Sequence, residues 1–264
     1  MFGNLFDQVE FVEQRITFVS SENEKLAQQN VSGEYPVNLY ISKSSTTDLH
    51  LTGQVLWPVT HLLCWYCLVN RSIFKNKHVV ELGAGVGLAG LFCGLYCEPK
   101  SMMITDGEPE IVTLLERNVK HSQETNKLEK NTAALSLFWG KEGDIEKCVK
   151  FFRQKTNNPT ATVDVVIGAD ILARALCDPK FPLQAAKELL LYGEDESSKG
   201  RTKQFFCAYN IRSEDSYQYV METAKSMGFH VVEINICDFL PKPWPVVLES
   251  NGKTMRFFVF EFTL

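Results

Sequence analysis

The sequence lacks three features, and each absence excludes a class of protein. It has no run of about 20 apolar residues, the length that a membrane-spanning helix needs. The most apolar window, 55–69, is shorter and carries Thr60 and His61, so no membrane span is expected. No secretory signal is recognisable at the N-terminus. A net positive charge is also lacking, since the net charge is -5, so no broad cationic field is available to attract nucleic acid.

The eight cysteines lie mostly in apolar stretches, which predicts reduced thiols in a cytoplasmic or nuclear protein. Cys64 and Cys67 form a C-x-x-C, and Cys93 and Cys97 are one helical turn apart. These four residues are a conceivable zinc set. Both pairs fall on predicted helices without the tight turns that usually present zinc ligands, so core packing is favoured and no metal is expected.

The stretch from His78 to Asp106 carries the strongest pattern. The β-branched run His78–Leu82 predicts a buried parallel strand. A predicted helix at 88–96 and a second strand at 102–105 follow, and Asp106 stands at the carboxyl end of that strand, where open α/β sheets bind ligands. Between the first strand and the helix lie three glycines at alternate positions, which permit a sharp turn and close approach of a ligand: Gly83, Gly85 and Gly87.

An acid at position 106 is well placed to accept hydrogen bonds from both hydroxyls of a ribose, so we expect a nucleoside cofactor. The dinucleotide pattern G-x-G-x-x-G requires a glycine at position 88, where the chain has Leu88, and this disfavours an NAD-linked oxidoreductase. The carboxylate of Glu81, just before the turn, is suited to pair with a positively charged ammonium group of the cofactor. The alternative is that the glycines only let helix and sheet pack closely.

Strands and helices alternate through the rest of the chain. Short alternating stretches at 14–20 and 35–42 predict a small antiparallel element, and Trp57-Pro58 begins a helix that extends to about Asn70. Further helices are expected around 111–119 and at 144–154, 183–192 and 215–227, and further strands at 133–139, 164–170, 204–209, 231–236 and 256–263.

This order predicts an α/β fold, a Rossmann-like doubly wound seven-stranded sheet. The last strand follows the sixth without a helix, so it should run antiparallel as a hairpin partner. We expect two parts, an N-terminal β accessory element at 1–50 and the main domain at 51–264. The polar stretch 42–50 is a candidate lid, although a plain linker is the more common identity. Asn251-Gly252 is a turn signal before the last strand.

From about Thr52 onward the chain resembles the seven-strand protein-lysine methyltransferases. The matching segments are TGQVLWPVTHLL, ELGAGVGLAG, TDGEPEIVTLLERNV, LFWG, DVVIGAD and AYNIRSEDSYQYVMETAKSMGFHV. The resemblance implies S-adenosyl-L-methionine as the cofactor. It also implies a pocket formed by Glu81, Gly83, Gly85 and Gly87, with Asp106 on the ribose, Trp139 beside the adenine, Ala169 closing the pocket by its backbone and Trp57 at the rim. For Trp139 an ordinary core role is the alternative.

The chain departs from the family after the acid that follows the fourth strand. The usual D-x-x-Y is here Asp170-Ile171-Leu172-Ala173, so the aromatic residue is missing. Tyr209, expected at the end of the next strand, is a candidate replacement, and Asp170 is our candidate for orienting the nucleophile. A cap on the following turn is the alternative role for Asp170.

The sequence therefore predicts a protein N-methyltransferase acting on lysine, without metal or nucleophilic side chain. Alternatives are another protein nitrogen (arginine, histidine or an N-terminal amine), a small molecule, or a weakly catalytic cofactor-binding scaffold. We expect a monomer with a protein substrate and no nucleic-acid or membrane partner. Substrate recognition is expected in residues 1–50, 171–182 and the loop around 240–245.

Overall fold

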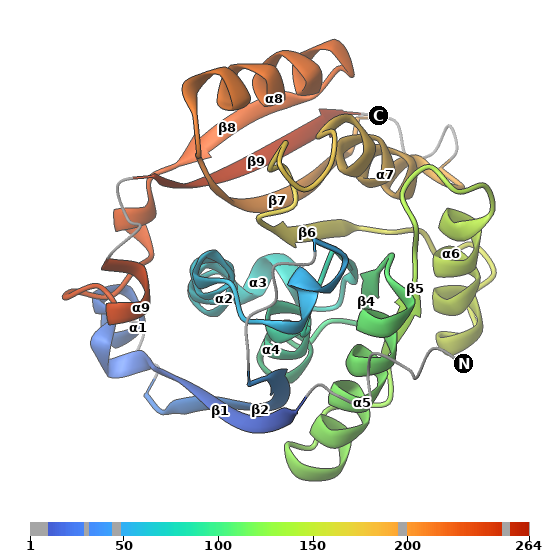
Figure 1. Cartoon of the computed structure of the whole chain (residues 1–264). Coiled ribbons are helices and arrows are strands. Elements are labelled where there is room, and N and C mark those ends of the chain that lie inside the picture. The colour runs from blue at the N-terminus through green and yellow to red at the C-terminus, as the bar shows by residue number, and fades with distance from the viewer. Residues whose placement is uncertain (1–9, 29–31, 44–48, 195–199, 250–253, 264) are drawn as a thin grey trace, which may run out of the picture.

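The computed structural model describes residues 10–28, 32–43, 49–194, 200–249 and 254–263 (Figure 1). These residues form two sheets. A two-stranded antiparallel sheet pairs β1 with β2, and a seven-stranded sheet has the order β5-β4-β3-β6-β7-β9-β8. The strands are β1 (Phe11–Val19), β2 (Glu34–Ser42), β3 (His78–Leu82), β4 (Ser101–Asp106), β5 (Thr132–Ser136), β6 (Val165–Ala169), β7 (Thr202–Asn210), β8 (His230–Ile234) and β9 (Met255–Thr263).

Helices connect the strands of the larger sheet. None of the helices in the described ranges is both long enough and apolar enough to cross a membrane. The helices are α1 (Glu24–Gln28), α2 (Pro58–Val69), α3 (Arg71–Phe74), α4 (Leu88–Tyr96), α5 (Pro109–Thr125), α6 (Asp144–Lys155), α7 (Lys180–Leu191), α8 (Glu214–Ser226) and α9 (Val246–Glu249), with short 3-10 turns at Ser20–Glu22, Leu49–Gln54 and Ile236–Asp238.

The strand directions confirm the predicted topology. β3 pairs in parallel with both β4 and β6, and the parallel pairing continues outward to β5 on one side and to β7 on the other. β9 lies between β7 and β8 and runs antiparallel to both. Because β5, β4, β3, β6 and β7 run parallel, their carboxyl ends gather at one edge of the sheet, and this edge carries the predicted site.

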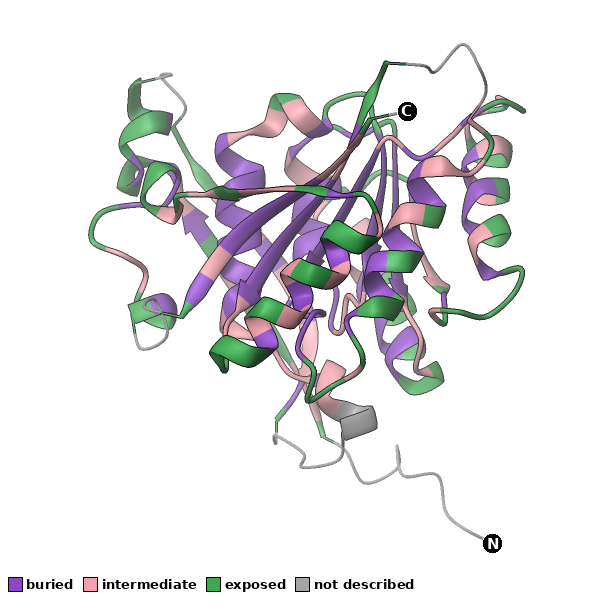
Figure 2. Cartoon of the chain, turned by 90° about the horizontal axis from the view of Figure 1, so that it is seen from above, coloured by how far each residue is buried: buried purple, intermediate pink, exposed green. Residues whose placement is uncertain are grey.

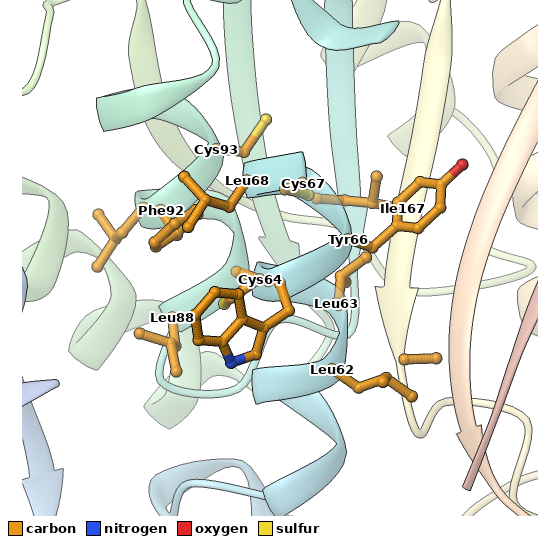
Figure 3. Packing of buried hydrophobic residues seen from close by; sticks show 14 of the residues in the cluster. Leu62, Leu63, Cys64, Tyr66, Cys67, Leu68, Leu88, Phe92, Cys93 and Ile167 are labelled. Atoms are coloured by element: carbon orange, nitrogen blue, oxygen red, sulfur yellow. The ribbon is translucent and has the colours of Figure 1, made fainter. Parts of the chain in front are cut away.

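Helices cover both faces of the sheet (Figure 2). One face packs against α2, α4 and α5, and the other packs against α6, α7 and α8. The central strand β3 is buried along its whole length, as its uninterrupted apolar run predicts. Cys64 and Cys67 of α2 and Cys93 of α4 are fully buried at the contact between these two helices (Figure 3), which confirms a packing role for them.

The predicted strand 133–139 ends earlier than expected, at Ser136. The Leu137 N–H still bonds to the Asp106 carbonyl of the neighbouring strand, but the Phe138 N–H turns to the side chain of Asp144, at 3.0 Å. The capping carboxylate thus draws the chain away from the sheet edge before Trp139. The alternation of apolar residues along a strand does not reveal such a bond from a backbone N–H to a side chain six residues later.

The predicted strand 164–170 is also shorter by one residue at each end. β6 starts after Asp164, whose carboxylate accepts the His78 N–H at 2.8 Å. It stops before Asp170, which has a left-handed φ of 62° and so cannot continue the strand. Most of the candidate lid at 42–50 and the Asn251-Gly252 turn lie outside the described residues.

One buried side chain fastens the small N-terminal sheet to the larger domain. Asn118 of α5 is fully buried, and its amide bonds to both backbone groups of Tyr40 in β2, at 2.7 Å and 3.0 Å. The same amide nitrogen donates to the Val86 carbonyl in the glycine turn, at 2.9 Å. Asn118 therefore joins three segments that lie far apart in the sequence.

We expect Asn118→Ala to lower the free energy of unfolding by about 2 to 3 kcal/mol, because it leaves three backbone groups without their partner. Urea unfolding at neutral pH measures this loss. Gln123→Ala on the same helix is the matched control, since Gln123 makes one half-buried bond to the Thr132 carbonyl and should cost about 1 kcal/mol or less. Equal losses in the two variants would contradict a clamping role for Asn118.

Candidate functional site

The glycine turn after β3 has the backbone conformation that its sequence predicts. Gly83 and Gly85 have left-handed φ values of 58° and 55°, which residues with a side chain rarely adopt. A Cβ atom on Gly85 would also lie 3.0 Å from the Gly53 carbonyl oxygen. The turn is tied to the next strand, because the Ala84 N–H bonds to the Thr105 carbonyl at 2.9 Å. Glycine is therefore strongly favoured at these positions.

Asp106 lies beside this turn, at the carboxyl end of β4. Its Oδ2 accepts the Gly85 N–H at 3.0 Å and its Oδ1 accepts the Glu108 N–H at 3.2 Å. Burial raises the pKa of Asp106, and these backbone N–H groups oppose the shift. The carboxylate keeps further lone pairs that can accept from two vicinal hydroxyls. The predicted juxtaposition of Asp106 with the glycine turn is therefore present in the structure.

Glu81 is brought to the same turn but is engaged differently from the prediction. Only 1% of the residue is exposed, and its Oε2 accepts the Gly90 N–H in the first turn of α4, at 2.8 Å. A Cβ on Gly90 would collide with that oxygen, so this glycine allows the approach. The carboxyl caps a helix N-terminus, where N–H groups lack partners within the helix. The predicted contact with an ammonium group is not supported by this geometry.

Two side chains cover the first glycine of the turn. Ring atoms of Trp139 lie 3.2 Å and 3.3 Å from the position of a Cβ on Gly83, and a methyl group of Ile171 lies closer, at 2.6 Å. Trp139 thus adjoins the turn, although it follows β5 rather than ending it, and its place beside an adenine stays a prediction. Ile171 was missed, because an apolar residue after a strand carries no functional signal by itself.

Trp57 stands at the N-cap of α2, partly exposed, with its indole N–H donating to the Thr52 carbonyl at 3.1 Å. The Thr52–Trp57 segment approaches the glycine turn at Gly53, whose carbonyl oxygen lies close to Gly85. The predicted position of Trp57 at the rim is consistent with this arrangement.

The residues around the turn fit a nucleoside cofactor. Two buried side-chain N–H groups have no hydrogen-bond partner within the described residues, Nε2 of Gln54 and Nε1 of Trp139. Trp139 lies against Gly83, and Gln54 follows Gly53, whose backbone lies beside Gly85. A buried donor without a partner costs about 1 to 3 kcal/mol, so such a pair indicates a ligand rich in acceptors. Gln54 was not among the predicted site residues.

A second group of polar residues gathers where β6 and β7 end. Ala169 is the last residue of β6, and the Asp170 that follows is 4% exposed. Both carboxylate oxygens of Asp170 bind Arg212, with Nη1 at 2.9 Å from Oδ1 and Nη2 at 2.5 Å from Oδ2. Oδ1 also accepts the Asn210 N–H at 3.3 Å. Arg212 was not among the predicted site residues, because its partner lies 42 residues earlier in the chain.

The prediction for Tyr209 needs correction. Tyr209 is 0% exposed and packs in the core on the face covered by α6, α7 and α8, with its hydroxyl 3.4 Å from the Ser216 hydroxyl. Burial raises the pKa of this phenol. Ala173, where the family carries an aromatic residue, is 1% exposed and lies in the same core cluster. The buried Tyr209 ring therefore does not replace the aromatic residue that is missing at Ala173.

Known proteins resemble the chain over most of this region. A family model described as lysine methyltransferase matches residues 37–225. A calmodulin-lysine N-methyltransferase of Arabidopsis thaliana is 29% identical over 193 residues, 72% of this chain and 55% of that protein. A protein N-lysine methyltransferase of Danio rerio is 30% identical over 118 residues, 45% of this chain and 47% of that protein. The chain thus spans about half the length of these relatives.

Solved structures support the fold. A SAM dependent methyltransferase from Aquifex aeolicus superimposes with a TM-score of 0.50 at 14% identity, covering 75% of this chain and 88% of that one. A protein from Streptococcus mutans described as a SAM-dependent methyltransferase also gives 0.50, at 13% identity, covering 87% of this chain and 53% of that one. At these identities the likeness shows the fold alone.

We expect the Glu81 carboxyl to make stability fall with rising pH. Burial raises its pKa from 4.5 to about 8, so the folded protein holds a proton that the unfolded chain releases. Stability is therefore lost progressively between these two pH values, by on the order of 4 kcal/mol at the upper end. Glu81→Gln keeps an acceptor for the Gly90 N–H but cannot ionise, so its stability relative to wild type should rise across this window.

Urea unfolding at about pH 5 and about pH 8 measures this difference. Glu110→Gln, on the exposed surface of α5, is the control and should show no pH-dependent difference from wild type. If the two variants behave alike, Glu81 does not carry the buried proton.

Proposed function

The chain belongs to the lysine methyltransferase family, and from this membership and the geometry of the cleft we propose that it is an S-adenosylmethionine-dependent protein N-methyltransferase acting on a lysine side chain. The family model spans residues 37–225 and so includes the glycine turn, Asp106, Trp139 and Asp170. The observation that carries the proposal is the hydrogen bond of 3.0 Å between the Gly85 N–H and Asp106, which places an acid beside a left-handed glycine turn.

The chain's own residues account for binding and alignment. When bound, S-adenosylmethionine supplies an electrophilic methyl group on a positively charged sulfur. Asp106 would accept from the ribose hydroxyls, and the backbone of the glycine turn would lie against the cofactor without intervening side chains. Trp139 and Ile171 lie over Gly83. They would shield this side of a bound cofactor from water, which favours methyl transfer to a neutral amine over transfer to solvent.

Of the described residues at the ends of β6 and β7, neither Asp170 nor Tyr209 is arranged as a free general base. Both oxygens of Asp170 are held by Arg212, and the hydroxyl of Tyr209 is enclosed beside Ser216. Methyl transfer to an amine is an in-line displacement, which depends mainly on the alignment of donor and acceptor. We infer that the protein supplies alignment and that the lysine ammonium gives its proton to solvent water before the neutral amine attacks.

The segment after β6 is a candidate surface for the protein substrate, in agreement with the expected recognition region 171–182. It is held against α8 by Arg174, whose guanidinium lies 4.5 Å from the Tyr219 ring, and by a hydrogen bond of 3.2 Å from Tyr219 to Asp178. Leu176 between them is 39% exposed. A fixed backbone with an exposed apolar side chain suits recognition of a protein surface. We further propose a monomer in the cytoplasm or nucleus.

The proposal predicts transfer of labelled methyl groups from S-adenosylmethionine to a discrete protein in a cell lysate, at lysine. Asp106→Ala should abolish the labelling and weaken S-adenosylhomocysteine binding by at least about tenfold, because the ribose loses its acceptor. Mass spectrometry of the labelled protein identifies the modified residue, and calorimetry measures the binding.

Asp164→Asn is the matched control, since Asp164 lies at the amino end of β6, away from the cleft, and bonds to the His78 N–H. It should keep both labelling and binding. Modification of arginine, histidine or an N-terminal amine would replace lysine in the proposal. Binding without labelling would favour a scaffold or a small-molecule substrate, and absence of binding by the wild type would refute the proposal.

A further inference from the structure

Arg212 is the residue that most tightly fixes the carboxyl end of β6. Its guanidinium forms a two-point ion pair with Asp170 and also donates to the Asn210 carbonyl at 3.1 Å. The Asp170 carboxylate is 4% exposed, whereas 34% of the Arg212 side chain is exposed. The pair therefore lies just beneath the surface, with Arg212 covering the acid. Hydrogen bonds to Asp170 raise the pKa of Arg212, so the arginine stays charged.

The backbone of Asp170 requires such support. Its φ of 62° is left-handed, a conformation that costs a residue other than glycine about 1 kcal/mol or more. Four interactions hold it there: the two bonds to Arg212, the Asn210 N–H on Oδ1, and its own N–H bonded to the Ala208 carbonyl at 2.8 Å. Backbone strain at a cleft persists when surrounding contacts over-determine it.

The left-handed turn at Asp170 sets where the next side chain lies. Ile171 sits over two glycines, with methyl groups 2.6 Å from the position of a Cβ on Gly83 and 2.7 Å from that of a Cβ on Gly168. Ala169, two residues before Ile171, still belongs to β6 and packs on the opposite face of the sheet, against the core beneath α2 and α4. A change of the Asp170 backbone would therefore displace Ile171 from the glycine turn.

We propose that Arg212 is a positioning residue of the cofactor cleft, acting through Asp170 to hold Ile171 against the glycine turn at Gly83. This inference rests on the proposed function, because the cleft is taken to bind S-adenosylmethionine. It also assigns Asp170 a role different from orienting the acceptor amine, since its carboxylate is held by Arg212 and Asn210. Arg212 makes no contact with the reacting atoms in this assignment.

The planar fork of arginine is essential to the geometry. Two parallel bonds to one carboxylate fix its plane as well as its position, whereas the ammonium group of lysine acts as a point charge. Arg212→Lys should therefore keep the charge and lose most of the positioning. An exposed ion pair contributes little to stability. The Asp170 carboxylate is buried, however, and removal of the Arg212 guanidinium would leave it without its counter-charge.

The test measures the affinity for S-adenosylhomocysteine by calorimetry, at a temperature where each variant is folded. We expect Arg212→Ala and Arg212→Lys to weaken binding by at least about tenfold, as small misplacements of a binding site do. Asp170→Asn should weaken it similarly. The double variant Asp170→Asn/Arg212→Ala should be no weaker than either single variant, because both act through one contact.

Chemical rescue separates positioning from a loss of stability. Millimolar guanidinium, far below denaturing concentrations, should restore binding to Arg212→Ala by occupying the vacated site beside Asp170. It should not restore the Asp170→Asn/Arg212→Ala protein. A purely destabilised variant would gain nothing, since guanidinium only weakens folding. Arg153→Met on α6 controls for general effects. It removes a partly buried arginine that donates to the Ala161 carbonyl, and the variant should bind S-adenosylhomocysteine normally.

The outcomes are distinct from those that test the proposed function. If the wild-type protein fails to bind S-adenosylhomocysteine, the proposed function fails. If the wild type binds and Arg212→Ala binds equally well, the positioning role is overturned while the function stands. Additive losses in the double variant, or absence of rescue by guanidinium, would likewise overturn the role of the ion pair.

Discussion

The hydrogen bond between the Gly85 N–H and the Asp106 carboxylate is the contact on which the rest of the site depends. It joins the ends of two neighbouring parallel strands, β3 and β4, at the point where the chain first crosses over the sheet. The turn is left-handed at Gly83 and Gly85, and its glycines carry no side chain, so other segments can approach its backbone closely. The segments that surround the site, around Gly53, Trp139 and Ile171, all make contact with this turn.

Three acids near the turn are satisfied in the same manner. Glu81, Asp106 and Asp170 each accept a backbone N–H, from Gly90, Gly85 and Asn210 respectively. Buried carboxyl groups are stable only when they are paired or hydrogen-bonded, so these bonds explain why acids are tolerated at the sheet edge. They also fix the three carboxyl groups in place, which suits a displacement reaction that needs alignment more than acid–base catalysis.

The sequence predicted local features well and tertiary ones poorly. The turn, the strand before it and Asp106 were predictable because neighbouring residues determine them. The side-chain direction of Tyr209 was not, because Phe205 through Tyr209 are buried on both faces of the sheet and their apolar run has no alternation. Only the register shows that Tyr209 lies with Phe205 and Cys207 on one face, and Phe206 and Ala208 on the other. Arg212 and Asp170 are paired by the parallel pairing of β6 with β7, which no local pattern reveals.

The N-terminal sheet is bound to the site by the same kind of long-range contact. A two-stranded hairpin is marginally stable alone, so β1 and β2 depend on the surface that they cover. Phe18 is buried there against Trp65 of α2 and Phe92 of α4, at ring distances of 5.6 Å and 4.7 Å. Asn118 completes the attachment through Tyr40 and the Val86 carbonyl. Since Val86 lies between Gly85 and Gly87, the residue that holds the hairpin also holds the glycine turn.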